Sequence, residues 1–243
     1  MADFAVHKEP QLLNPGAAEL VDSKSVNIEA LTKYQMLLTN VRFAWQKTKK
    51  YQTYFGAFYV NDEIVDRVEA LNHHIHAYLQ DMDTLKNKIM VLLAELGKDL
   101  RGVASNKEDI KEFIEAGKEK TLEVFDGVLK HRVPHVHHGM RFIDGDLLKA
   151  ENAHETIKMF SEGPMSEMLN PDYKDEWFEE LKKEKEESFE SAKKRWINMA
   201  AGNDEQSSGY LNHLLEIIKP SLYQFLKIKP SVEIFETLHG KND

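Results

Sequence analysis

The chain contains no cysteine, which excludes disulfide bonds, thiolate zinc sites, iron–sulfur clusters and a cysteine nucleophile. Glycine and proline are also scarce, with 12 and 7 among 243 residues, so the chain is neither collagen-like nor a Gly/Pro-rich disordered polymer. The longest strongly apolar run covers only residues 89–94, whereas a membrane-spanning helix needs about 20 such residues. The N-terminal residues MADFAVHKEP lack the basic and then apolar layout of a secretion signal. These absences predict a cytoplasmic protein that does not enter a membrane.

An excess of positive charge is absent as well. Acidic residues outnumber basic ones by 41 to 32, which gives a net charge of −9. A protein that coats nucleic acid without sequence preference is normally basic, so this role is not expected, although a small cationic site is compatible with the composition. Apolar residues make up 42% of the chain and charged residues 30%, which is typical of a packed core inside a charged exterior.

The clearest pattern that is present is a long helical seam. Apolar residues recur at alternating spacings of four and three over more than four heptads. They are Ile64, Val68, Leu71, Ile75, Tyr78, Met82, Leu85, Ile89, Leu92 and Leu96. This pattern predicts a helix of about 35 residues, roughly 50 Å long, with caps at Asn61 or Asp62 and stops at Gly97 and Gly102. Its partner is expected to be the preceding helix, antiparallel across a short connection, or else a helix of another molecule.

Weaker periodicity and capping signals predict five further helices. Asn27 caps the first, which is expected to continue into residues 51–59. Ser105 and Glu108 form a capping box that opens another, and this helix should end near Arg132 because Pro134 disfavours helical geometry at the residue before it. The remaining helices are expected at residues 145–163, 170–195 and 209–219, with Pro220 bending or restarting the last one.

These elements together predict an all-α fold, an up-and-down helical bundle with a long antiparallel helical hairpin. Residues 1–26 have no sustained period and are expected to form an irregular N-terminal arm. Residues 27–163 are expected to form the core bundle. Residues 164–243 are expected to supply additional helices that pack on this bundle within the same domain.

Histidines form two clusters in the sequence. The first is in the segment LNHHIHAYL, where His74 lies beside the predicted seam. Glu69, His73 and His76 are spaced i, i+4 and i+7, so they share one helix face and could offer a carboxylate and two imidazoles to one metal ion. The same spacing also fits a polar outer face or the wall of an active site without a metal.

The second cluster is in the segment KHRVPHVHHGM. Arg132 is expected to end one helix, and His137 is expected in the first turn of the next. An imidazole can take or give a proton near neutral pH, and a guanidinium can hold a phosphate and stabilise charge that develops on it. Such a pair suits metal-independent cleavage of RNA, in which His activates the ribose 2′-hydroxyl and Arg stabilises the pentacoordinate phosphate.

This combination of features resembles the HEPN (higher eukaryote and prokaryote nucleotide-binding) superfamily. Its members are all-α bundles with a motif in which an Arg is followed by a His after four to six intervening residues. Arg132 and His137 match this motif, His138 also lies within its window, and the resemblance covers about residues 27–160. It implies a metal-independent ribonuclease, or a nucleotide- or RNA-binding module, of a bacterial defence or toxin-type system. It further implies no cofactor, a homodimer in which two motif copies face each other, and an antitoxin-type protein partner.

Four more residues are expected to bind the substrate: His135, Arg141, Arg67 and His74. Arg67 also precedes histidines at the spacing of the motif, and Arg141 would add positive potential unless it pairs with Asp144 or Asp146. Asp144 could instead orient an imidazole. Two other functions fit the sequence. One is a non-enzymatic helical interaction or scaffold protein that uses the seam, and the other is a helical-bundle metalloprotein that uses the first histidine cluster.

Overall fold

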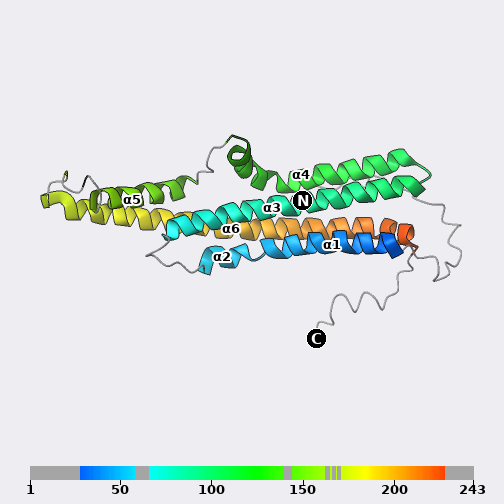
Figure 1. Cartoon of the computed structure of the whole chain (residues 1–243), viewed down its shortest axis with the longest axis horizontal. Helices are drawn as coiled ribbons and strands as arrows, with labels where there is room; N and C mark the ends of the chain where they lie inside the picture. The colour runs from blue at the N-terminus through cyan, green and yellow to red at the C-terminus, as the bar shows by residue number, and fades with distance from the viewer. Residues whose placement is uncertain are drawn as a thin grey trace, which may run out of the picture. The chain divides into compact units, whose positions relative to one another are not determined.

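The computed structural model describes residues 28–57, 66–138, 144–161, 165, 168 and 171–227. Every regular element in these residues is a helix, so the prediction of an all-α fold is confirmed (Figure 1). The helices are α1 (Ile28–Thr48), α2 (Tyr51–Ala57), α3 (Arg67–Val103), α4 (Lys107–His138), α5 (Gly145–Ser161) and α6 (Pro171–Leu226). The predicted N-terminal arm, residues 1–26, lies outside the described residues. Within the described ranges, no helix is both long enough and apolar enough to cross a membrane.

The described residues divide into two compact units, and four helices contribute to both. The first unit contains residues 28–43, 85–124 and 207–227. The second unit contains the described residues of 44–84 and 125–206. Each unit therefore takes segments from the predicted core bundle, residues 27–163, and from the predicted additional helices, residues 164–243.

In the first unit, segments of α1, α3, α4 and α6 lie side by side (Figure 1). The Tyr34 hydroxyl on α1 donates to Asp99 Oδ2 on α3 at 2.8 Å, and Lys33 Nζ also lies 2.8 Å from this oxygen. The Thr121 hydroxyl on α4 is 2.6 Å from the hydroxyl of Tyr210 on α6. Polar contacts thus join both helix pairs beside the apolar core.

The second unit has an aromatic core. Phe55 on α2, Tyr78 on α3 and Trp196 on α6 are buried and in mutual contact, with ring centroids 5.7 to 6.4 Å apart. Burial raises the pKa of Tyr78 to about 12, although the hydrogen bond that its hydroxyl receives from Asn203 Nδ2 at 2.8 Å acts in the opposite direction. Aromatic rings of this size bury much apolar surface, so they hold these three helices together.

The predicted seam is buried inside the chain. From Val68 to Leu96, each of its nine described residues has no more than 3% of its surface exposed. A second buried row, Leu79, Leu93 and Leu100, lies beside it on α3. Since α1 contacts α3 in antiparallel order, with Lys33 near Asp99 and Lys47 near Asp81, the predicted antiparallel hairpin is confirmed. The seam is therefore not available to a helix of another molecule.

Several predicted helix ends are wrong. The first predicted helix is split at Lys49 and Lys50 into α1 and α2. The long helix α3 does not stop at Gly97 but continues to Val103, and its cap is Asp66, whose Oδ1 accepts a hydrogen bond from the backbone N–H of Val68 at 2.8 Å. Asn61 and Asp62 lie outside the described residues.

The cap of α4 is Asn106 rather than Ser105, since Asn106 Oδ1 accepts from the backbone N–H of Glu108 at 3.1 Å. Both residue types cap helices well, and the sequence does not decide between neighbours.

The prediction that Pro134 ends its helix near Arg132 is wrong, and the two helices predicted at residues 170–195 and 209–219 are parts of one helix that continues through Pro220. The helix α4 runs past Pro134 to His138, and α6 is one helix of 56 residues that includes Pro220. A proline inside a helix removes one backbone hydrogen bond and usually bends or breaks the helix. Around Pro220 this loss is offset by packing, because Ile218 and Leu222 on either side are buried.

Candidate functional site

A buried carboxylate joins the start of α5 to the middle of α6. Asp144 Oδ1 caps α5 by accepting the backbone N–H groups of Asp146 and Leu147 at 3.1 and 3.0 Å. Its other oxygen, Oδ2, accepts from the indole Nε1–H of Trp196 at 2.9 Å, and the Arg195 guanidinium forms an ion pair with the same carboxylate. Both oxygens of this buried group therefore have donors, as a buried charge requires.

The next acidic residue extends this network towards solvent. Asp146 Oδ2 accepts from Ser191 Oγ at 2.9 Å and from Arg195 Nη1 at 2.8 Å. The hydrogen bond from Ser191, followed by that from Arg195, lowers the pKa of Asp146. Burial acts against the charge of Arg195, but its hydrogen bonds to Asp144 and Asp146 prevail and raise its pKa. The guanidinium is thus held in a fixed position by two carboxylates.

A hollow of about 540 Å³ opens along this face of α6. It is lined by Ser191, Lys194, Arg195, Asn198 and Met199, whose spacing of i, i+3, i+4, i+7 and i+8 makes one stripe along the helix. Lys194 is exposed, and it forms no ion pair or hydrogen bond with another described residue. The hollow is shallow and widely open to solvent, and the Lys194 ammonium at its surface could contact an anionic group.

The predicted catalytic motif immediately precedes this network in the sequence. The residues Arg132, His135, His137 and His138 occupy the last two turns of α4. Their side chains lie outside the described part of the structure, as does all of Arg141. Asp144, six residues after the end of α4, contacts Arg195 at the edge of the hollow. The motif and the hollow are therefore near each other in the sequence, and residues 139–143 between them lie outside the described residues.

Arg67, a predicted substrate-binding residue, already has partners in the folded chain. Its guanidinium forms an ion pair with Glu186 on α6, with Nη1 at 3.2 Å from Oε1, and it lies 4.8 Å from the centre of the Phe189 ring. Asp144 and Asp146, the two alternative partners expected for Arg141, both bind Arg195, and Arg141 itself lies outside the described residues. In this structure Arg67 links α3 to α6.

Next to Arg67, three charged or polar groups meet in a part-buried cluster. Lys185 Nζ lies 2.6 Å from Asp66 Oδ2 and 2.9 Å from His154 Nδ1. An ammonium only donates hydrogen bonds, so Nδ1 is the acceptor in this contact. Burial alone would raise the pKa of Asp66, but the hydrogen bonds from Lys185 and the Val68 N–H lower it overall.

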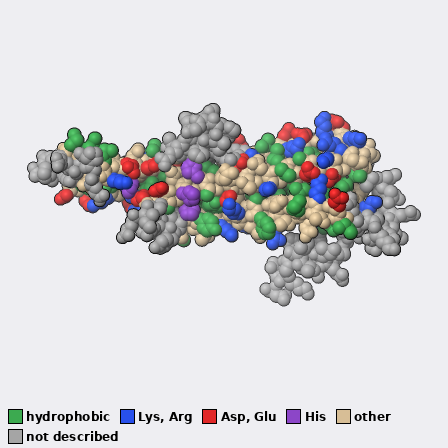
Figure 2. Space-filling view, in the orientation of Figure 1, with side chains coloured by type: hydrophobic (Ala, Val, Ile, Leu, Met, Phe, Trp, Pro, Cys, Tyr) green, Lys and Arg blue, Asp and Glu red, His purple; other side chains and the backbone are tan. Residues whose placement is uncertain are grey.

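The first histidine cluster lies on the surface of α3. His74 is half-buried, with its ring centre 6.1 Å from those of Tyr54 and His73, and burial followed by the charge of His73 lowers its pKa. Histidine side chains are adjacent on the face shown in Figure 2. In the described ranges, no three His, Asp or Glu side chains are grouped so that they could hold a metal ion, and Glu69, His73 and His76 form no such group.

Sequence reasoning misses the residues that line the hollow. Residues 170–195 are so rich in alternating charges that the pattern favours a solvated helix. A buried stripe through Phe189, Ala192, Trp196 and Ala200 shows that one face of this segment is packed. Spacings of three, four and four continue past residue 195, and a window extended to residue 200 reveals this buried face. It leaves Ser191 and Lys194 on the opposite, exposed face and Arg195 at the edge of the buried one.

No model of a known protein family, no curated protein and no solved structure matches this chain.

Proposed function

We propose that this protein is a HEPN-like ribonuclease that cleaves RNA without a metal, and that it works as a homodimer. The observation that supports the proposal is the hollow on α6, which is lined by Lys194 and Arg195, and Arg195 is paired with Asp144, six residues after the end of the helix that carries the Arg–His motif. Within the hollow, the exposed Lys194 ammonium is the group that would contact an RNA phosphate, because Arg195 is already paired with Asp144 and Asp146. The all-α bundle is the fold that the resemblance implies.

In the proposed reaction, His137 takes the proton from a ribose 2′-hydroxyl, and the resulting oxygen attacks the adjacent phosphate. Arg132 stabilises the charge that develops on the phosphate oxygens. The bond to the 5′-oxygen of the next nucleotide then breaks, and this oxygen receives a proton from the protonated imidazole or from His138. The products are a 2′,3′-cyclic phosphate and a 5′-hydroxyl.

The continuity of α4 has a consequence for how this pair is assembled. Five residues along an α-helix correspond to a rotation of about 140°, so positions 132 and 137 occupy different faces of α4. We therefore assign Arg132 of one subunit and His137 of the other to the same catalytic site. The homodimer implied by the resemblance supplies such a composite site on each side of a two-fold axis.

The test is cleavage of a labelled single-stranded RNA by the purified full-length protein in the presence of EDTA. Arg132→Ala and His137→Ala should each lower the cleavage rate by about 100-fold or more, because each removes a group that acts only in the transition state. Arg42→Ala and His213→Ala, which change exposed residues on α1 and α6, are the matched controls and should retain the rate. Circular dichroism checks that all four variants stay helical.

Mixing the two inactive variants tests the composite site. If Arg132 and His137 act across the dimer, half of the redistributed dimers are mixed and each has one intact site, so about a quarter of the wild-type rate should return. No recovery, with mixed dimers demonstrated by mass spectrometry, would contradict the assignment across subunits. Wild-type rates in both single variants would remove the proposed nuclease function altogether.

A further inference from the structure

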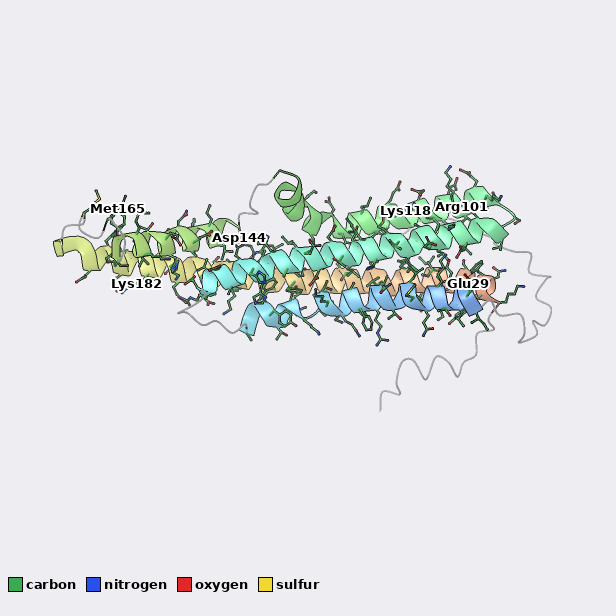
Figure 3. All side chains as sticks on the ribbon, in the orientation of Figure 1. Glu29, Arg101, Lys118, Asp144, Met165 and Lys182 are labelled. Atoms are coloured by element: carbon green, nitrogen blue, oxygen red, sulfur yellow. The ribbon has the colours of Figure 1, made fainter. Side chains whose placement is uncertain are left out.

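The end of the α5–α6 hairpin exposes methionine side chains. Met159 in the last turn of α5 is 42% exposed, and Met165 and Met168 in the connection to α6 are 37% and 73% exposed. Figure 3 labels Met165 at this end of the hairpin, and Figure 2 shows hydrophobic side chains gathered there. These three residues are named the methionine tip. Methionine is flexible and polarisable, and it is used repeatedly at surfaces that bind apolar helices of varied sequence.

Aromatic packing supports the hairpin next to the methionine tip. The rings of Phe160 on α5 and Trp177 on α6 are in edge-to-face contact at 5.2 Å, and the ring of Phe178 is 5.6 Å from Trp177. All three are half-buried. Met159 therefore extends from a helix that is packed against α6, and Met165 and Met168 belong to the connection between these two packed helices.

The part of α6 nearest the methionine tip is acidic. Residues 175–183 contain four carboxylates, at Asp175, Glu176, Glu179 and Glu180, and only two lysines. Lys182 is bound to Glu179 at 2.7 Å, whereas Asp175, Glu176 and Glu180 are exposed and form no ion pair with another described residue. Lys158 on α5 is one exposed cation in this region. Negative charge that has no partner within the described chain thus borders exposed apolar surface.

We propose that the methionine tip is a docking site for an amphipathic helix with a basic polar face, contributed by another protein. The methionines would receive apolar side chains spaced i, i+3, i+4 and i+7, and the free carboxylates would pair with lysine or arginine on either side of them. A bilayer fits this surface less well, because the anionic cytoplasmic leaflet repels carboxylates. RNA is repelled for the same reason. The proposal does not depend on nuclease activity.

The test uses full-length protein carrying ¹³C at the methionine ε-methyl groups, titrated with a synthetic amphipathic helix of leucine and lysine. The signals of Met159, Met165 and Met168, assigned by single Met→Leu variants, should move, while that of Met36, an exposed methionine on α1, should not. A peptide of the same pattern with glutamate in place of lysine should bind at least tenfold more weakly, since it meets like charge.

A triple variant, Met159→Gln, Met165→Gln and Met168→Gln, should lower the affinity for the basic peptide by about tenfold or more, since it removes the apolar anchors. Met36→Gln is the matched control and should change the affinity less than twofold. Equal binding of both peptides, or signal shifts confined to other methionines, would overturn the proposal. Vesicles of anionic lipid provide a third measurement. If the protein binds these vesicles more tightly than the basic peptide, and if the triple variant loses this binding, the surface is assigned to a membrane instead.

Discussion

The helices α3 and α4 approach each other closely at Gly97, and replacing this glycine should reveal how tightly the two helices pack. A Cβ built on Gly97 would lie 2.8 Å from Ile114 Cγ1 and 3.3 Å from its Cγ2. These atoms belong to a β-branched side chain, whose first torsion is nearly fixed in a helix, and Ile114 is buried. Ile114 therefore cannot turn away, and the helices themselves must separate in Gly97→Ala.

Two opposing effects determine how much Gly97→Ala changes the free energy of unfolding. Alanine in place of glycine inside a helix stabilises it by about 1 kcal/mol. Overpacking of a close-packed core costs about 1–3 kcal/mol. The net result for Gly97→Ala should be a loss of roughly 1 kcal/mol in the free energy of unfolding. Gly209, inside α6, is the matched control because a Cβ added there would have no atom within 4 Å, and Gly209→Ala should gain about 0.5–1 kcal/mol.

Urea unfolding followed by far-ultraviolet circular dichroism measures both changes. The double variant Gly97→Ala with Ile114→Ala separates the clash from other effects, because the new methyl group then fills space that the isoleucine has vacated, and the combined loss should be smaller than the sum of the two single losses. A Gly97→Ala protein at least as stable as the wild type would refute the reasoning, since it would mean that α3 and α4 can separate without loss of packing.

Two further perturbations probe the second unit. The folded-state pKa of Asp66 is lowered, so its ion pair with Lys185 stabilises the fold above the unfolded-state pKa of about 4 and loses this effect as the pH falls. Lys185→Met should therefore destabilise the protein most at neutral pH. If the urea midpoints of variant and wild type differ equally at about pH 3 and at neutral pH, this prediction is contradicted. Trp196→Phe leaves buried Asp144 Oδ2 without its indole donor and should lower the free energy of unfolding in urea by about 1–3 kcal/mol. The control is Trp45→Phe, at a less buried position. An equal loss in this control would indicate only a general effect of tryptophan removal.

The seam of α3 could be predicted because its evidence is local. Spacings of four and three between apolar residues place those residues on one face of any helix, and burying that face is the main way in which a helix gains stability in a protein. The cap at Asp144 has a local signal of the same kind, since aspartate is a preferred N-cap residue and the apolar residues Leu147 and Leu148 begin three positions later.

Other features depend on contacts between distant parts of the chain, and the sequence alone does not contain them. Arg195 and Asp144 are 51 residues apart, and nothing in either segment selects the other as its partner. Pro134 and Pro220 disfavour helix locally, yet the helices continue through both. For the candidate site, the sequence supplies the Arg132 and His137 hypothesis, whereas the pairing of Arg195 at the hollow depends on how the start of α5 packs against α6.

The division of the chain into two units has a consequence for how such a protein can evolve. Every boundary between the units falls inside a helix, at residues 43–44, 84–85, 124–125 and 206–207. Neither unit is a continuous stretch of sequence, so no single cut in the gene releases one of them for fusion to another protein. Recombination at any of these four boundaries would break a helix, whereas a short insertion between two helices would leave both intact.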